Sequence, residues 1–304
     1  MLRKYEIIEG KLVESQSPNA SVLTFIQPDD AEKKFLLEQC KIDEHTLNSC
    51  FDPDELARME FEPEHIALIY KRPKNYSSAD QFLFRVTSSG IFLFKDRLIF
   101  ILTEDTPFFD GKLFLRITSL PSLMLKILSR SIFHFLEHLK TINMISDALE
   151  QKISTSMENS YLLNLFTLEK SLVYFLNAIN SNSMLIEKLR YNAGKIGLTA
   201  EDAELLDDLI IENNQCYKQA EIYSNILAGM MDARVSVVSN NLNILMKTLN
   251  IITIAIMVPT FVVSAFSMNV GIPFQHHPLA FWMIMGLATI SVMGFYLFWR
   301  YKKW

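Results

Sequence analysis

The sequence predicts an α+β domain followed by long stalk helices and two C-terminal transmembrane helices. Short strands rich in Phe, Ile and Leu occupy the first 120 residues, long stretches with helical apolar spacing follow, and two uncharged apolar stretches lie near the end. The chain has 304 residues, of which 50% are hydrophobic, and a net charge of -5. The mild acidity and the lack of a basic, aromatic-interleaved patch argue against a nucleic-acid partner.

Residues 1–120 are expected to form a cytoplasmic α/β domain. Pro, Asn, Ser and Gly separate its apolar runs, which is typical of short strands. The strand candidates are Ser21 to Ile26, His65 to Tyr70, Gln81 to Thr87, Gly90 to Lys95 and Arg97 to Thr103. Two further segments, Asp30 to Cys40 and Pro53 to Met59, are predicted helices, with Asp29 or Asp30 as the N-cap of the first.

Residues 121–248 are expected to form a cytoplasmic helical stalk. Ser122 to Ser156 and Tyr161 to Arg190 have apolar residues three and four apart and read as helices. After a break at 191–198, Thr199 opens another helix, since Asp202 stands three residues later as in a capping box. No proline follows until Pro259, so we expect one helix of about 65 residues, about 100 Å long, that continues from the stalk into the membrane.

Residues 249–300 are expected to hold two membrane spans, Asn250 to Phe266 and Phe281 to Trp299, joined by a short external loop at 267–280. Each span has 17 to 19 residues without a charge, close to the length that crosses the hydrocarbon core. The loop has no charged residue, whereas Lys247 and the basic tail at 301–304 flank the spans. The positive-inside rule therefore predicts a multi-pass protein of the inner (plasma) membrane with both termini in the cytoplasm.

A polar row within the first span indicates a pore. Its members follow one another in steps of three and four residues: Asn243, Met246, Asn250, Thr253, Met257, Thr260, Ser264 and Ser267. This heptad spacing places all eight on one stripe of a helix, over about 36 Å. In a single copy the stripe would face lipid, whereas several copies around an axis could line a channel with it. Alternatively, the row could pack the helix against other transmembrane helices.

The chemistry of the row favours a hydrated cation. Hydroxyl, amide and thioether groups are uncharged, so they hold a cation weakly enough to release it. The row contains no Asp or Glu, so a dehydrated divalent ion would not be trapped there. A hydrated ion can instead donate its water hydrogens to Asn and Thr oxygens.

An acidic segment opens the long helix. Six carboxylates lie between Glu201 and Glu212, which is typical of a solvated helix face. A functional interpretation is a low-affinity sensor of divalent ions between subunits, because oxygen ligands suit Mg²⁺. Its candidate ligands are Glu204, Asp207, Asp208 and Glu212.

The C-terminal 70 residues resemble the CorA family of magnesium channels. That family closes its first span with Gly-Met-Asn, and this chain has Ser267-Met268-Asn269 after a segment, 239–249, that is similar to the family's pore entrance. The resemblance implies a CorA-like homopentameric funnel that is no enzyme, needs no cofactor, and carries Mg²⁺ and possible substitutes such as Co²⁺ or Ni²⁺. The pore positions it implies are Asn243, Met246, Leu249, Met257, Thr260 and Asn269, with Leu249 in place of its neighbour Asn250.

The resemblance also implies roles for individual residues. Asn269 would form the outer ring that receives hydrated Mg²⁺, and Met246, Leu249 and Met257 would form hydrophobic constrictions. Asp208 matches an acidic regulatory position, where cytoplasmic Mg²⁺ would hold subunits together and close the pore.

Three departures from the family pattern leave alternatives open. Ser267 replaces a glycine, which could alter a tight turn. The external loop has His276 and His277 where acids are common, and imidazole suits softer ions, so a ZntB-like zinc transporter is one alternative. The region 69–75, where the partner acid of Asp208 is expected, is basic. A non-conducting member and a membrane-anchored enzyme or sensor are further alternatives, although no catalytic motif is present.

Overall fold

The computed structural model describes residues 1–17, 19–155, 159–271 and 277–302. The chain divides into two compact units, Met1–Met231 and Asp232–Trp304. One helix, α6 (Ala200–Ala265), contributes residues to both units.

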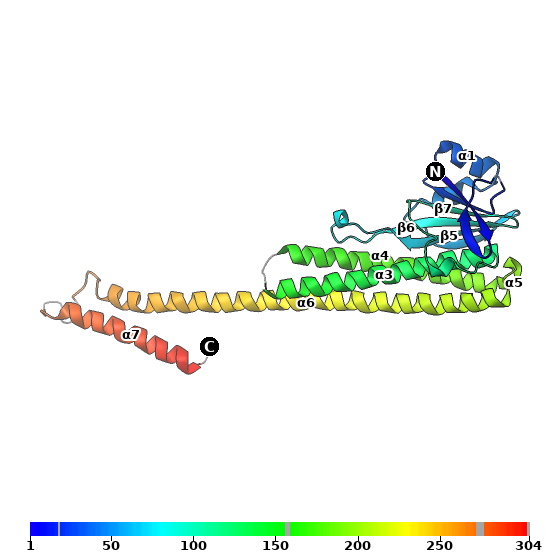
Figure 1. The fold of residues 1–304 in the computed structure, drawn as a ribbon. Coiled ribbons are helices and arrows are strands. Elements are labelled where there is room, and N and C mark those ends of the chain that lie inside the picture. Colours follow the sequence, from blue (N-terminus) through cyan, green and yellow to red (C-terminus); the bar gives the residue numbers. More distant parts are fainter. Residues whose placement is uncertain (18, 156–158, 272–276, 303–304) are drawn as a thin grey trace. The chain divides into compact units, whose positions relative to one another are not determined.

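The first unit contains a seven-stranded sheet in the order β2-β1-β3-β7-β6-β5-β4 (Figure 1). The strands are β1 (Leu2–Ile8), β2 (Lys11–Glu14), β3 (Val22–Ile26), β4 (Arg58–Phe61), β5 (His65–Pro73), β6 (Val86–Phe94) and β7 (Leu98–Leu102). The central pair β3 and β7 is parallel, and every other neighbouring pair is antiparallel. Parallel pairing follows from the long excursion between β3 and β7, because a tight hairpin joins only antiparallel strands.

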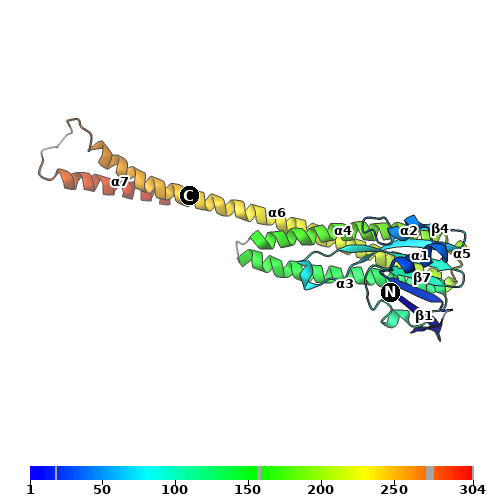
Figure 2. The same ribbon diagram turned by 90° about the horizontal axis from the view of Figure 1, so that it is seen from above.

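Helices cover both faces of this sheet (Figures 1 and 2). The short helices α1 (Asp30–Glu38) and α2 (Glu44–Ser49) lie on one face, and α3 (Leu120–Thr155) and α4 (Asn159–Tyr191) lie on the other. The two short 3₁₀ turns are η1 (Ser78–Asp80) and η2 (Lys112–Phe114), and α5 (Ala193–Ile196) connects α4 to α6. The stalk part of α6 completes the helical layer.

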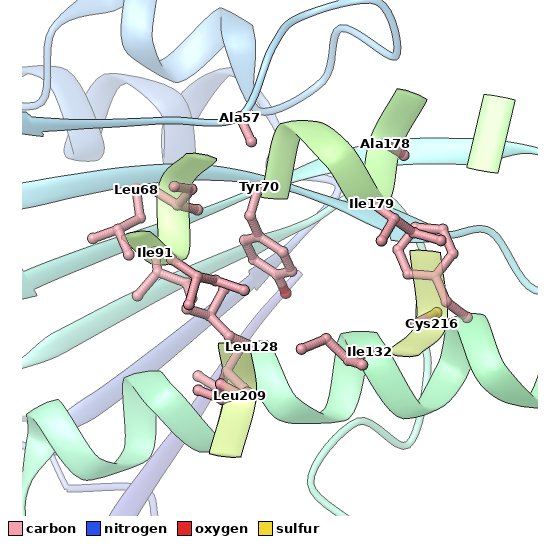
Figure 3. Packing of buried hydrophobic residues seen from close by; sticks show 14 of the residues in the cluster. Ala57, Leu68, Tyr70, Ile91, Leu128, Ile132, Ala178, Ile179, Leu209 and Cys216 are labelled. Atoms are coloured by element: carbon pink, nitrogen blue, oxygen red, sulfur yellow. The ribbon is translucent and has the colours of Figure 1, made fainter. Parts of the chain in front are cut away.

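The alternation of side chains along the strands builds two cores. In β7, Leu98 and Phe100 belong to the core shared with α3, α4 and α6, whereas Ile99 belongs to the core beneath α1 and α2. This division follows the two-residue period of a strand. Figure 3 shows the larger core, where Tyr70 of β5 points between the helices and Cys216 of α6 faces the same interior.

Buried polar side chains attach α4 to the sheet. The side chain of Asn182 accepts a hydrogen bond from the Lys71 backbone N–H and donates one to the Lys71 carbonyl, both at 2.8 Å. Ser181 Oγ accepts from the Ala57 N–H at 2.7 Å, and Ser171 Oγ accepts from the Phe84 N–H at 3.0 Å. These bonds satisfy backbone groups that no neighbouring strand pairs, since an unpaired buried group is costly.

The structure confirms the long helices and corrects two local predictions. Asp29 caps α1 with a full capping box, and Thr199 and Asp202 exchange hydrogen bonds at the start of α6. The helix predicted at Pro53 to Met59 is wrong, because the chain turns there and enters β4. The strand predicted at Gln81 to Thr87 is wrong over its first residues, because Gln81 and Phe82 have left-handed backbones (φ 47° and 68°) and β6 begins at Val86.

The second unit contains the end of α6 and α7 (Ala280–Lys302), which runs back in the opposite direction (Figure 2). Three helices among the described residues are long and apolar enough to cross a membrane. In α4 the apolar window is 39% buried within the first unit, against 0% for α6 and 6% for α7. The apolar residues of α4 therefore belong to a protein core, whereas those of α6 and α7 need lipid or other chains around them.

Candidate ion pathway

The two membrane helices meet along one face of each. Partly covered residues recur on α6 in steps of one, three and four: Ile251, Ala255, Val258, Pro259, Val262 and Phe266. Those on α7 recur in steps of three and four: Ala280, Ile284, Ala288, Ser291, Phe295 and Trp299. Such spacing marks a single helix face. Pro259 lies on the face of α6 that meets α7, and its missing N–H leaves the Ala255 carbonyl without its helical donor.

The predicted polar row lies on the opposite face of α6. At 100° per residue, the row centred near Met257 points away from the face that holds Val262 and Phe266. Its side chains are exposed, including Met246 at 56% and Met257 at 62%. Apart from Asn250, which lies beside α7, the second unit therefore leaves this row without a partner from α7.

The threonine hydroxyls of the row already donate their protons within the helix. Thr253 Oγ1 donates to the Leu249 carbonyl at 2.8 Å, and Thr260 Oγ1 donates to the Ile256 carbonyl at 2.7 Å. Because each proton is used, the remaining oxygen lone pairs act as acceptors. Acceptors that point outward suit the hydrogens of an ion's water shell.

Leu249 and Asn250 lie on the two edges of the row. Asn250 lines a hollow of about 230 Å³ together with Ile251 and with Phe295 of α7. Leu249 is 57% exposed, and its position on the helix is farther from α7. The structure thus places Asn250 beside α7 and leaves Leu249 on the free side.

Ser267, Met268 and Asn269 are exposed and begin two residues after α6 ends at Ala265. Ser267 donates twice to the Ser264 carbonyl, from its backbone N–H at 3.1 Å and from Oγ at 2.9 Å. Its backbone is outside the left-handed region, so this position does not need the conformational freedom of glycine. The hydroxyl of Ser267 instead satisfies a carbonyl at the helix end.

His277 caps the start of α7. Its Nδ1 accepts a hydrogen bond from the Leu279 N–H at 3.2 Å, and its carbonyl accepts from the Ala280 N–H at 3.0 Å. This role leaves only Nε2 of His277 for any other partner. The second histidine of the predicted pair, His276, lies outside the described residues, as does Gln275.

The acidic candidates form a row on the stalk part of α6. Glu204, Asp208 and Glu212 are spaced by four residues and therefore lie one above the other, and none has an ion pair within the described chain. Asp207 points elsewhere and bonds Arg190 at 3.1 Å. Burial and the charge of Asp208 raise the pKa of Glu212. Across the described ranges no group of three His, Cys, Asp or Glu residues is arranged to hold a metal, so one copy does not close a site.

Two of the three cations in the basic segment 69–75, Lys71 and Arg72, are buried, whereas Lys74 is exposed. Lys71 Nζ donates to the Pro53 carbonyl at 2.7 Å and to Ser88 Oγ at 3.0 Å. Arg72 is 1% exposed, and its guanidinium bonds Ser89 Oγ at 3.1 Å and Glu104 at 3.0 Å. Burial lowers the pKa of Lys71. Lys71 and Arg72 are therefore structural cations, and Lys74 is the basic side chain of this segment that faces solvent.

The hollow between α6 and α7 brings together residues that the sequence did not connect. Lys247 and Lys302 were expected only as flanking charges and Trp299 only as the end of the second span, and the three line the hollow together. Their spacing carried the signal, since 247, 250, 251 and 254 share one face of α6 and 295, 298, 299 and 302 share one face of α7.

Comparison with known proteins gives the chain a family. The model of the CorA-like Mg²⁺ transporter protein family matches residues 22–302. The Cobalt/magnesium transport protein CorA of Methanocaldococcus jannaschii is 25% identical over 311 residues, covering 98% of this chain and 96% of that protein.

Solved structures agree on the fold. The complete structure of the CorA magnesium transporter from Methanocaldococcus jannaschii has a TM-score of 0.82 at 21% identity, covering 98% of this chain and 96% of that one. The structure of the full-length CmaX protein has a TM-score of 0.74 at 15% identity, covering 99% of this chain and 97% of that one. The ZntB cytoplasmic domain from Vibrio parahaemolyticus has a TM-score of 0.58 at 14% identity, covering 78% of this chain and 98% of that one. The chain belongs to the family of CorA-like Mg²⁺ transporter proteins and is a membrane transporter rather than an enzyme.

Proposed function

We propose that this chain forms a homopentameric channel through which Mg²⁺, and also Co²⁺ or Ni²⁺, enters the cytoplasm. The observation that carries the proposal is the polar row on the face of α6 opposite α7. A transporter needs a polar path across the bilayer, and this row is the one long polar face of the described spans. Its relative in Methanocaldococcus jannaschii is named for cobalt and magnesium transport, which supports the choice of ions.

Self-association follows from the placement of the row. The apolar faces of α6 and α7 can face lipid, whereas polar groups are costly there. Copies arranged around an axis would turn the row of each α6 inward and surround a water-filled path. Both termini would lie in the cytoplasm, because Lys247, Arg300 and Lys302 lie at the same ends of the spans.

Residues at different depths of the proposed pore would have different roles. Asn269 would form an outer ring whose amide oxygens accept hydrogens from the water shell of the arriving ion. Thr253, Thr260 and Ser264 would continue this contact through hydroxyl oxygens, together with Asn243 at the inner end. Met246, Leu249 and Met257 would narrow the path with apolar side chains, and such constrictions gate by excluding water.

The stalk would sense the ion that has entered. Glu204, Asp208 and Glu212 would meet carboxylates or carbonyls of a neighbouring copy and share Mg²⁺ with them, and Asp207 would assist from beside this row. Asp208 and Glu212 repel each other, and a bound cation would reduce this repulsion. Mg²⁺ bound more tightly in the closed state would close the pore when cytoplasmic Mg²⁺ is high.

Zn²⁺ is the second candidate cargo, favoured by the histidines of the external loop. An ion-binding loop would need free imidazole nitrogens. His277 uses Nδ1 to cap α7, so it retains one nitrogen for an ion. This reduces the support for a zinc preference relative to Mg²⁺.

The test is ion entry into liposomes that carry the purified protein and an internal Mg²⁺-sensitive dye, with Zn²⁺ and Ni²⁺ measured in parallel. Mg²⁺ entry should be lost in Asn269→Ala and retained in Asn241→Ala, a matched asparagine on the side of α6 away from the row. Ser267→Gly should behave like the parent, because Ser267 is unstrained.

Two outcomes would contradict the proposal. Entry of Zn²⁺ alone would move the assignment to zinc transport and direct attention to the external loop. No flux of any ion, from protein shown to be folded and oligomeric, would favour a non-conducting family member.

A further inference from the structure

The hollow between α6 and α7 has an apolar interior and a basic rim. Ile251 and Ile254 of α6 and Phe295 and Phe298 of α7 form most of its wall. Lys247 and Lys302 lie at its rim. Its volume of about 230 Å³ is far too small for a whole lipid and suits a segment of acyl chain.

The rim carries hydrogen-bond donors that the described residues do not satisfy. Lys247 and Lys302 form no ion pair with any described residue, and the sequence contains no Asp or Glu after Asp232. Trp299 Nε1 is buried and lacks an acceptor among the described residues. A buried donor without a partner is costly, so these groups together indicate an anionic, oxygen-rich ligand.

We propose that this hollow binds one anionic phospholipid, with its phosphate beside Lys247 and Lys302 and part of an acyl chain against Ile254 and Phe298. A phosphate or ester oxygen would accept the Trp299 N–H. Basic pockets between transmembrane helices on the cytoplasmic side attract such headgroups, and the basic ends of α6 and α7 lie on that side in the proposed orientation. A zwitterionic headgroup brings its own cation, which the two lysines would repel.

This site rests on α6 and α7 spanning the bilayer and does not depend on which ion the pore carries. Lipid binding can therefore be measured without transport. A protein that conducts no ion could still bind the lipid, and a protein that conducts could fail to bind it, so the two proposals fail separately.

The experiment is native mass spectrometry of the full-length oligomer in detergent, titrated with phosphatidylglycerol or with phosphatidylcholine of the same acyl chains. Phosphatidylglycerol should bind more tightly. The double variant Lys247→Gln with Lys302→Gln should weaken its binding roughly thirtyfold, because each basic residue near a membrane surface contributes about a factor of five. Excess inorganic phosphate should not displace the lipid, since it cannot use the apolar wall.

Three matched variants separate this site from general charge attraction. Arg300→Gln removes a positive charge at the same depth but away from the hollow, and it should have little effect. Trp299→Phe keeps the ring and removes the donor, so it should weaken phosphatidylglycerol binding severalfold. Ile254→Trp fills the hollow, keeps every charge and should also weaken binding.

Several results would overturn the proposal. Equal binding of the two lipids, or no retained lipid, would exclude an anionic lipid site. An Arg300→Gln effect as large as that of the lysine pair would show non-specific attraction to the basic helix ends. Displacement by inorganic phosphate would assign the rim to a soluble anion.

Discussion

The two units of this chain differ in how far their side chains are buried against one another. In the first unit, buried residues from the sheet, α3, α4 and α6 form a continuous core. In the second unit, Ala288 is the one buried residue among those described. The first unit therefore contains the contacts that a fold in water needs, whereas the second unit leaves both apolar and polar faces open.

The open faces of the second unit indicate what must surround it. In the proposed channel, its apolar residues would face lipid, and the polar row on α6 would face copies of the same helix. The asymmetry teaches that the contacts of the first unit's fold lie within one chain, whereas the proposed ion path through the second unit would need several chains.

The largest expected effect is on the core of the first unit. Phe175 is fully buried, and its ring lies 5.1 Å from that of Phe135. Phe175→Ala should lower the free energy of unfolding by about 3–5 kcal/mol, because it removes buried surface and leaves a cavity. Phe261→Ala, at a side chain that is 75% exposed, is the matched control and should change stability by less than about 0.5 kcal/mol.

Circular dichroism during chemical denaturation of the detergent-solubilised protein measures both variants. A loss at Phe261 as large as that at Phe175 would show that the second unit also has an internal core, and the contrast between the units would fail.

The next effect concerns the stalk, which lies in the first unit but is proposed to need a second copy. Mg²⁺ should raise the free energy of unfolding by up to about 2.7 kcal/mol at a concentration a hundred times its Kd. The double variant Asp208→Asn with Glu212→Gln should lose this gain. Glu221→Gln removes an acid that pairs with Lys218 on the same helix and should keep it.

Thermal unfolding with increasing Mg²⁺ gives the result, with Ca²⁺ and high NaCl as controls for general screening. Full Mg²⁺ stabilisation of the double variant would exclude these carboxylates as the sensor.

Two histidines on α3 should make the free energy of unfolding depend on pH, with a smaller change per pH unit than the effects above. Burial lowers the pKa of His134 to about 3, with further contributions from the charges of His138, Arg72 and Arg130, and burial lowers the pKa of His138 to about 4. Below pH 6.5 the unfolded chain binds protons that the folded chain does not. Stability is therefore full above pH 6.5 and falls as pH decreases toward 4.

Each histidine should contribute a slope of up to about 1.4 kcal/mol per pH unit. The His138 ring packs against Phe84 and Phe175, and the His134 ring lies 4.4 Å from that of His138. A double variant with phenylalanine at 134 and 138 should therefore fit and flatten the slope between pH 6.5 and 4. Denaturation curves across this range measure it. An unchanged slope would show that other groups cause the acid sensitivity.

Local signals explain which parts of the fold were predictable. The long helix was expected at about 65 residues and has 66, because its capping box and the lack of proline before Pro259 are readable in the sequence. The edge strand β2 and its neighbour β1 were missed, since they lack fully buried residues and mix charged with apolar residues. The first two residues of β4, Arg58 and Met59, were placed in a predicted helix, because their strand conformation depends on pairing with β5, for example Met59 with Leu68.

The candidate ion path was also predictable only where it depends on local helical periodicity. The helical period alone places Thr253, Met257 and Thr260 on one face, and the structure has them there. The cap formed by His277 and the hollow beside Asn250 could not be foreseen, because they depend on how the chain returns from α6 to α7. The stalk site depends on groups from another copy, which one sequence does not place.

The most direct test of the central claim is the accessibility of α6 in the assembled protein. Cysteines are placed one at a time at Thr253 and Thr260 on the polar row, and at Ala255 and Val262 on the face toward α7, after the three native cysteines are replaced. Mg²⁺ flux into liposomes is then measured before and after a water-soluble thiol reagent. The reagent should block flux at 253 and 260 and leave it unchanged at 255 and 262. Equal block on both faces, or block at 255 and 262 alone, would contradict a pore lined by this face of α6.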